Sequence, residues 1–206
     1  DYYPLTIFVT RDNYIKKISA VSLRSSTTEH KLKETDEIVQ TMESTNKSEL
    51  IFFSNKCVAY KMKIYDLADA KVSTMGEYLP GILGLEEDEK IVYTVVTTDY
   101  KGEMLFTFEN GKMAKVALSN YETKTNRKKL IGAYGNKSPI CDIRLLDEDK
   151  DVVLMSDNNR VLLVNTEKIP LKATKSTRCI QVITLRKKDA KVVKVVDKEQ
   201  CTVEDI

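Results

Sequence analysis

Four segments of the chain share one order of hydrophobic and polar positions: an apolar run, a short polar turn, and a second apolar run that usually carries lysine. The segments begin at Thr6, Leu50, Met104 and Val152. The last residues of their turns, which align the segments, are Asn13, Cys57, Gly111 and Asn159. The spacings between these residues are 44, 54 and 48. Paired apolar runs around a polar turn predict β-hairpins, and their recurrence predicts a repeat architecture.

The turn residues support this prediction. A two-residue hairpin turn requires positive φ, which Gly and Asn adopt more readily than other residues. Gly111, Asn13 and Asn159 meet that requirement. Cys57 does not, so we expect its turn to be longer or differently registered.

A second apolar part follows each hairpin after a polar loop. In the last three repeats it has a charged turn inside it, at residues 82–96, 140–155 and 179–196. Four strands in a repeat of this length are typical of a propeller blade. The chain has no sustained 3.6-residue periodicity, so long helices are not expected. The sequence predicts one all-β, propeller-like domain over residues 1–206. Its blades are expected near residues 5–49, 50–103, 104–151 and 152–196, and residues 197–206 are expected to form an acidic tail.

Composition excludes several classes of protein. No apolar run approaches the roughly 18 to 20 residues of a membrane-spanning helix, and the first residues have neither the basic nor the apolar part of a signal peptide. The four cysteines are scattered and there is one histidine, His30, so a zinc site is not expected. We expect a soluble, intracellular protein with reduced thiols. Because the first residue is not Met, we also expect a segment of a longer chain.

Charge is unevenly distributed, although the net charge is only +2. Residues 160–194 contain ten Lys or Arg and two acidic residues, whereas acidic residues concentrate at 86–89 and 147–151. Such segregation favours a polyanion-facing surface beside acidic turns. A solvated charged surface without a partner is the alternative that charge alone leaves open.

The repeats resemble a known family. Residues 55–63, NKCVAYKMK, follow the blade pattern N-K-G-x-x-Y-x-x-K, and residues 82–91 follow L-L-x-L-x-x-x-E-K-I. On these motifs the chain is similar, over residues 5–196, to the β-pinwheel C-terminal domain of the DNA gyrase and topoisomerase IV A subunits. The gyrase box Q-R-R-G-G-K-G is absent. Residues 22–37 stand in its place and keep Arg24, Lys31 and Lys33 without the glycines. The resemblance therefore favours a topoisomerase IV-like or otherwise divergent subunit over a gyrase-type DNA wrapper.

The resemblance implies a function for the parent protein. Its A subunits would pass one DNA duplex through a break in another, as a homodimer acting with an ATPase B subunit in the cytoplasm, at the nucleoid. ATP and Mg²⁺ would bind other domains or subunits, so no cofactor is expected here. The catalytic tyrosine and the metal-binding carboxylates would also lie elsewhere. We expect the tyrosines of this chain to be packing residues, and His30 to lie at the surface without a catalytic role.

Duplex DNA binding is the role that remains for this chain. Basic loops following each hairpin would form a curved track of phosphate contacts, which carry no sequence code. The candidates are Lys16, Lys17 and Arg24; Lys61, Lys63 and Lys71; Lys124, Arg127, Lys128 and Lys129; and Lys172, Lys175 and Arg178. A propeller-like protein-interaction scaffold without DNA binding is the alternative, because a fold does not decide function.

Overall fold

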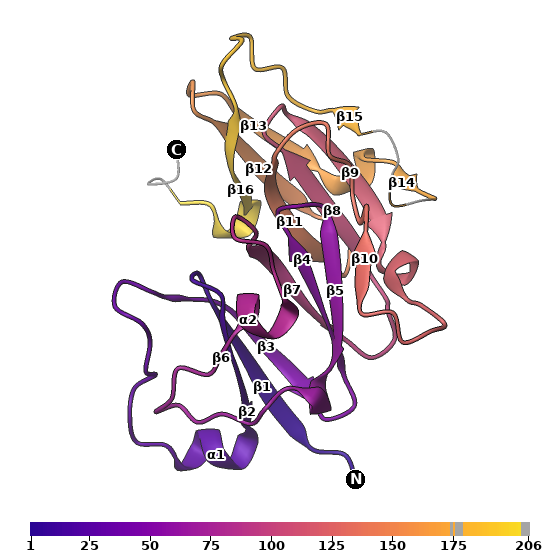
Figure 1. The fold of residues 1–206 in the computed structure, drawn as a ribbon. Helices are drawn as coiled ribbons and strands as arrows, with labels where there is room; N and C mark the ends of the chain where they lie inside the picture. Colours follow the sequence, from indigo (N-terminus) through magenta and orange to yellow (C-terminus); the bar gives the residue numbers. More distant parts are fainter. Residues whose placement is uncertain (174, 176–178, 203–206) are drawn as a thin grey trace. The chain divides into compact units, whose positions relative to one another are not determined.

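The computed structural model describes residues 1–173, 175 and 179–202. Almost all of its regular structure is β, arranged in four small sheets (Figure 1). The described chain divides into two compact units, residues 1–99 with 127–129, and residues 100–126 with 130–206. The prediction of an all-β blade-repeat fold is confirmed. The single domain predicted over residues 1–206, with its blade limits, stays a prediction.

Each repeat opens with a hairpin. The four hairpins are β1 (Pro4–Thr10) with β2 (Tyr14–Ser19), β4 (Glu49–Ser54) with β5 (Val58–Lys63), β8 (Glu103–Phe108) with β9 (Lys112–Ala117), and β12 (Asp151–Ser156) with β13 (Val161–Asn165). All four aligned turn residues have positive φ, at 69° for Asn13, 61° for Cys57, 84° for Gly111 and 65° for Asn159. The turn at Cys57 is therefore not exceptional.

The turns are longer than the predicted two-residue loops. In the first hairpin the Asn13 N–H donates to the Thr10 carbonyl at 3.1 Å, and Val9 pairs with Ile15. The corresponding pairs of the other hairpins, such as Phe53 with Ala59, enclose the same number of residues. Three-residue hairpin loops that end with a residue of positive φ are, like two-residue turns, compatible with the right-handed twist of the two strands.

A third strand pairs with the first strand of each hairpin. These strands are β3 (Ile38–Thr45), β7 (Ile91–Thr97), β11 (Ile140–Leu146) and β16 (Val192–Asp197). All four pairings shift register near the turn end of the first hairpin strand. The first hairpin strand is therefore central in its sheet. This position explains why β4 reads as a continuous apolar run, since Leu50, Ile51, Phe52 and Phe53 are all fully buried.

The outer strand of a sheet comes from the following repeat. The second repeat supplies β6 (Glu77–Tyr78) to β2, and the third supplies β10 (Lys129–Ile131) to β5. The fourth supplies β14 (Leu171–Lys172) and β15 (Ile180–Gln181) to β9. The sheets are therefore not built from contiguous segments. In the described residues the fourth sheet has three strands, β13, β12 and β16, where the sequence predicted four.

Helical segments are short. The α-helices are α1 (Ala20–Ser25) and α2 (Leu79–Leu83), and the 3-10 turns are η1 (Ile64–Asp66), η2 (Leu118–Tyr121), η3 (Thr166–Lys168) and η4 (Lys198–Gln200). The Ser19 hydroxyl caps α1 by accepting the Ser22 N–H at 3.2 Å. Neither α-helix has the length and apolar content of a membrane crossing, a finding limited to the described residues.

The predicted acidic tail begins as an anchored segment. Arg144 Nη1 donates to Asp197 Oδ1 at 2.6 Å, and Lys150 Nζ lies 3.3 Å from Asp197 Oδ2. The Arg144 guanidinium also contacts Asp142 and donates to the Val195 carbonyl at 2.8 Å. These bonds fix the end of β16 to β11. Residues 203–206 of the predicted tail lie outside the described residues.

Candidate nucleic-acid interface

The structure corrects the prediction for Lys17, which is not at the surface. Its side chain is only 6% exposed, and Nζ donates to the Ile64 carbonyl at 3.2 Å and pairs with Asp69 at 3.2 Å. Lys115 occupies the same hairpin position in the third repeat. Its Nζ donates to the Thr166 carbonyl at 2.9 Å, and Thr166, like Ile64, begins a 3-10 turn of the next repeat. The repeated lysine therefore tethers one repeat to the next, and Lys17 is removed from the DNA-binding candidates.

Lys16 is also buried, and the structure argues against a phosphate contact there too. Nζ donates to the Val72 carbonyl at 3.1 Å and lies 3.2 Å from His30 Nδ1. Burial lowers the pKa of Lys16. The His30 ring packs on Phe8 with centroids 4.5 Å apart, and burial together with the Lys16 charge lowers the pKa of His30. His30 is thus a partly buried packing residue rather than the surface residue predicted.

Five predicted cations gather in the first unit along the pairing of β5 with β10. We call this set the basic edge; it comprises Lys61, Lys63, Arg127, Lys128 and Lys129. The Lys61 N–H donates to the Lys128 carbonyl at 2.8 Å, which brings together positions more than sixty residues apart in the sequence. Lys61 is half-buried and the other four are exposed.

Two aromatic rings orient lysines of the basic edge. Lys63 Nζ lies 5.7 Å from the centroid of Tyr65, and Lys129 Nζ lies 5.8 Å from that of Tyr60. Both distances are within the range of cation–π attraction. The Tyr60 hydroxyl donates to buried Glu89 at 2.9 Å. The ammonium group of Lys129 is therefore held toward the protein, over a ring that is itself fixed by a buried carboxylate.

Glu89 is the inward-facing member of the acidic turn at residues 86–89. Burial opposes its ionisation, but hydrogen bonds from the Ser54 side chain, the Glu86 N–H and the Tyr60 hydroxyl outweigh burial and lower the pKa of Glu89. The nearby Lys129 charge acts in the same direction. The Glu89 carboxylate thus fixes the Tyr60 ring on which Lys129 of the basic edge lies.

Arg24 and Lys71 lie elsewhere in the first unit. Arg24 is exposed in the last turn of α1, and Lys71 is exposed in the loop after η1. The Lys31 N–H donates to the Val72 carbonyl at 2.9 Å, so the backbone of the exposed Lys31 runs beside that of Lys71. The segment that replaces the glycine-rich box therefore still presents cations.

The second unit holds the remaining candidates. Lys124 is exposed after η2, while Lys172 and Lys175 are half-buried. Lys175 Nζ lies 5.8 Å from the ring centroid of Tyr121, whose hydroxyl donates to the Ala133 carbonyl at 2.7 Å. Burial raises the pKa of Tyr121, which fits a packing role. Arg178 lies outside the described residues.

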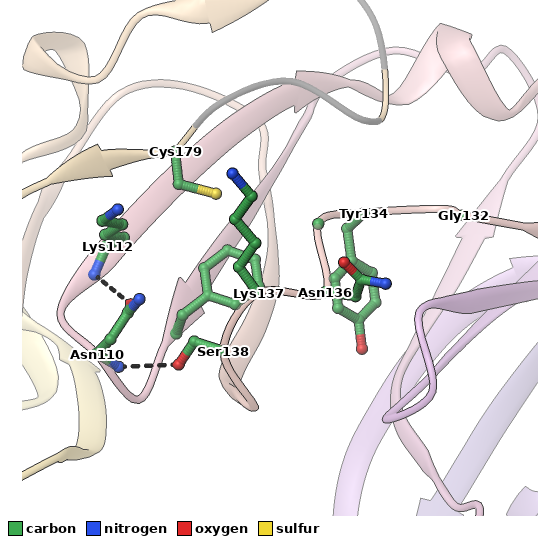
Figure 2. A pocket seen from close by; sticks show the side chains of 10 residues that line it. Asn110, Lys112, Gly132, Tyr134, Asn136, Lys137, Ser138 and Cys179 are labelled. Carbon is green, nitrogen blue, oxygen red and sulfur yellow. Dashed lines mark hydrogen bonds between the residues drawn. The ribbon is translucent and has the colours of Figure 1, made fainter.

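A cavity of about 350 Å³ adjoins β9 in the second unit. Figure 2 shows Lys112, Lys137 and Cys179 among its lining residues. Burial raises the pKa of the Cys179 thiol, although the charges of Lys112, Lys137 and Lys172 oppose the shift. Lys112 and Lys137 were not among the predicted candidates. Each follows an asparagine–glycine or glycine–asparagine turn, the only sequence signal that marks them as projecting.

Within residues 1–173, 175 and 179–202, no three His, Cys, Asp or Glu side chains are placed to hold a metal ion. What the described basic residues offer is exposed positive charge, suited to binding an anionic surface.

Comparison with known proteins agrees with this fold. No family model matches the chain. The A subunit of DNA topoisomerase 4 from Staphylococcus epidermidis is 24% identical over 165 residues, which cover 78% of this chain and 21% of that protein. The chain thus spans about a fifth of the relative. The solved C-terminal domain of DNA topoisomerase IV superposes with a TM-score of 0.82 at 23% identity, covering 95% of this chain and 61% of that one.

The corresponding domain of DNA gyrase A gives a TM-score of 0.61 at 18% identity, covering 95% of this chain and 66% of that one. The two superpositions show that both solved domains share the fold found here, and the sequence match points to the same group of proteins. The chain is therefore related to the C-terminal β-pinwheel domains of the type IIA topoisomerase A subunits, in agreement with the prediction from its hairpin repeats.

Proposed function

We propose that this chain is an accessory domain of a type IIA topoisomerase, carried by its A subunit, and that it binds and bends duplex DNA without reading its sequence. The observation that carries the proposal is the basic edge, where Lys129 of β10 and the two residues before it, Arg127 and Lys128, lie along β5 with Lys61 and Lys63. Its exposed cations can neutralise neighbouring phosphates, with release of counterions.

The helices favour binding without sequence readout. Major-groove recognition usually inserts a helix or a two-stranded ribbon that carries base-contacting side chains. The described α-helices have only six and five residues, which is less than two turns each. Cationic side chains on a strand edge would instead contact the backbone, which positions a duplex and carries no sequence code.

Bending requires several contacts at once. A smooth bend of a 20–30 base-pair site costs on the order of 1 to 6 kcal/mol, more than one surface ion pair supplies. Within the first unit, the basic edge would act with the exposed Arg24, Lys31 and Lys71. Lys124, Lys172 and Lys175 are the candidates of the second unit. Lys16 and Lys17 take no part, because their ammonium groups are bonded internally.

The relatives suggest the setting. The parent protein would act as a homodimer with an ATPase B subunit, in the cytoplasm at the nucleoid, and pass one duplex through another. The better superposition on the topoisomerase IV domain favours that type over gyrase. This domain would guide DNA with side-chain cations alone and would need no cofactor of its own.

The test is a fluorescence anisotropy titration at several salt concentrations. We expect replacement of Lys63, Arg127 and Lys128 by Ala to weaken binding equally on unrelated duplexes. Each lost phosphate contact should reduce the slope of log K against log salt by about 0.9, so the triple change should reduce it by about 2 to 3.

The matched control replaces three exposed lysines outside the candidate set by Ala: Lys47, Lys90 and Lys168. Its slope of log K against log salt should differ from that of the unmodified chain by no more than about 0.9, the value for one phosphate contact. Energy transfer between dyes at the two ends of a 30-base-pair duplex should report bending. If the intact chain has no DNA affinity at low salt, the protein-interaction scaffold replaces this proposal.

A further inference from the structure

The cavity beside β9 has a chemical character that the proposed DNA contacts do not explain. Its volume of about 350 Å³ lies within the range of about 300 to 1,000 Å³ that is typical of pockets for small molecules. All ten lining residues belong to the second unit. They come from the hairpin of β8 with β9, the loop at residues 132–138 and Cys179, so the cavity is formed within one unit.

Two buried aromatic rings line the cavity, those of Phe108 and Tyr134. Phe106 stacks on Tyr134 with the ring centroids 4.8 Å apart, and the ring of Phe108 lies tilted at 6.1 Å from that of Tyr134. Contacts of this kind hold the rings in fixed positions. They therefore offer a preformed apolar surface on which another planar ring can pack.

Two lysines bring positive charge to the same cavity. Lys112 begins β9, and Lys137 lies in the loop before β11. Both charges act on the Cys179 thiol, as does that of Lys172, so the two ammonium groups reach one region of the cavity (Figure 2). None of the described lining residues is acidic. Among the described residues neither Lys112 nor Lys137 forms an ion pair, and the cavity therefore favours an anion.

Two polar side chains of the loop add hydrogen-bonding groups. The Asn110 N–H donates to the Ser138 hydroxyl oxygen at 3.2 Å, which leaves the hydroxyl hydrogen of Ser138 for another acceptor. In the described part of the chain, the Asn136 side-chain amide makes no hydrogen bond to protein. A primary amide both donates and accepts hydrogen bonds. It therefore complements the edge of a heteroaromatic ring that does the same.

Together these groups indicate one class of ligand, because lysines bind phosphate as point charges and aromatic side chains bind planar rings. We infer that the cavity binds a free nucleoside monophosphate, with the base against the two rings and the phosphate at the two lysines. The volume is near the lower end of the usual range, which favours a monophosphate over a longer nucleotide. The bases of a duplex are stacked and paired, so this site is separate in chemistry from the basic edge of the first unit.

The probe is adenosine monophosphate, added to the full 206-residue chain. It should slow the alkylation of Cys179 by iodoacetamide, which mass spectrometry measures for each cysteine. Cys57 is the internal control, because it is also a half-buried free thiol but lies in the first unit, and its alkylation should not change. The amide resonances of residues 132–138 should shift in a ¹⁵N spectrum. Adenosine and inorganic phosphate should each bind about tenfold or more weakly, since each lacks one set of contacts.

Variants locate the site. Lys112→Met and Lys137→Met each remove a charged contact, and each should weaken binding about tenfold or more. Gly135→Leu should abolish binding by filling the cavity, since its Cβ would meet the Cys179 Sγ at 3.8 Å, an ordinary van der Waals distance. Lys188→Met is the matched control, because Lys188 is an exposed lysine of the same unit that does not line the cavity, and this variant should bind normally. Thermal unfolding checks that each variant is folded.

Three results would overturn the inference: alkylation of Cys179 that is unchanged at about 1 mM adenosine monophosphate, normal binding by both lysine variants of the cavity, or protection of Cys179 by a single-stranded oligonucleotide at lower concentration than by the mononucleotide. The last would assign the cavity to an unpaired base of DNA. The chain with Lys63, Arg127 and Lys128 replaced by Ala should bind the mononucleotide normally. Failure of DNA binding at the basic edge is therefore distinguishable from failure of this inference.

Discussion

The tether made by Lys115 provides a direct test of how one repeat holds the next. We would replace Lys115 by Met, which keeps the length and most of the volume of the side chain and removes only the ammonium group. The Thr166 carbonyl then loses a charged donor at 2.9 Å, and Asp149 and Glu103 lose a partner at 3.1 and 3.4 Å.

The three interactions contribute unequally. A hydrogen bond from a charged group contributes about 1.5 to 3 kcal/mol. The Asp149 and Glu103 side chains are 39% and 34% exposed, so water can solvate both carboxylates when the ammonium group is removed. Each ion pair is therefore expected to contribute about 1 kcal/mol or less. Removing the buried ammonium group also removes the cost of its desolvation, which offsets part of this loss of stability. The net destabilisation is therefore about 2 kcal/mol, which in a chain of this size lowers Tm by about 4 to 8 °C.

The assay is thermal unfolding followed by circular dichroism, combined with hydrogen exchange. Amides of η3 should exchange faster in the Lys115→Met variant, because Thr166 begins that turn. Lys137→Met is the control, since Lys137 is exposed, and its Tm should stay within about 2 °C of the unmodified chain. An unchanged Tm and unchanged exchange in Lys115→Met would refute the tether.

Two further predictions concern the hairpin turns and the acidic turn. Cys57→Gly should stabilise the chain by about 0.5 to 1 kcal/mol, because glycine adopts the backbone angle of this position, φ 61°, without strain. Gly111→Ala should destabilise the chain by about 2 kcal/mol or more, because the added Cβ would lie 2.5 Å from the Ile183 carbonyl oxygen. Urea unfolding measures both free-energy changes, and equal effects of the two substitutions would contradict the turn geometry. Glu89 should titrate below the ordinary glutamate pKa, so its stabilisation is complete above that ordinary value and is lost as pH falls through the lowered pKa. A ¹³C titration of the carboxylate measures this pKa, and Glu89→Gln should remove that part of the acid destabilisation.

Local chemistry made the hairpins predictable. Alternation of apolar residues and the left-handed preference of Gly111, Asn13 and Asn159 act within a few residues, and the structure has positive φ at each of them. The turn at Cys57 is longer than two residues, as expected, but it does not differ from the other three, because pairing of β4 with β5 in the shared register imposes the same turn on it.

The lysines were harder to assign. A lysine on a hairpin strand has the same sequence pattern whether it faces solvent or a carbonyl of the next repeat. Lys17 was therefore predicted at the surface, although its Nζ is bonded to the Ile64 carbonyl. By contrast, Arg127 and Lys128 were predicted in an exposed basic loop and are exposed. Their position beside Lys61 could not be predicted, because strand β10 has only three residues and no periodic signal.

The sequence by itself determined the all-β class, the four hairpins and their shared turn residues, because strand alternation and turn conformation are properties of neighbouring residues. Only the tertiary structure decided which strands complete each sheet. The donated strands β6, β10, β14 and β15 have two or three residues each, too few to encode a partner, and they form only where a preceding hairpin offers an edge. That pairing between repeats also decided which lysines became buried tethers and which ones gathered in the basic edge.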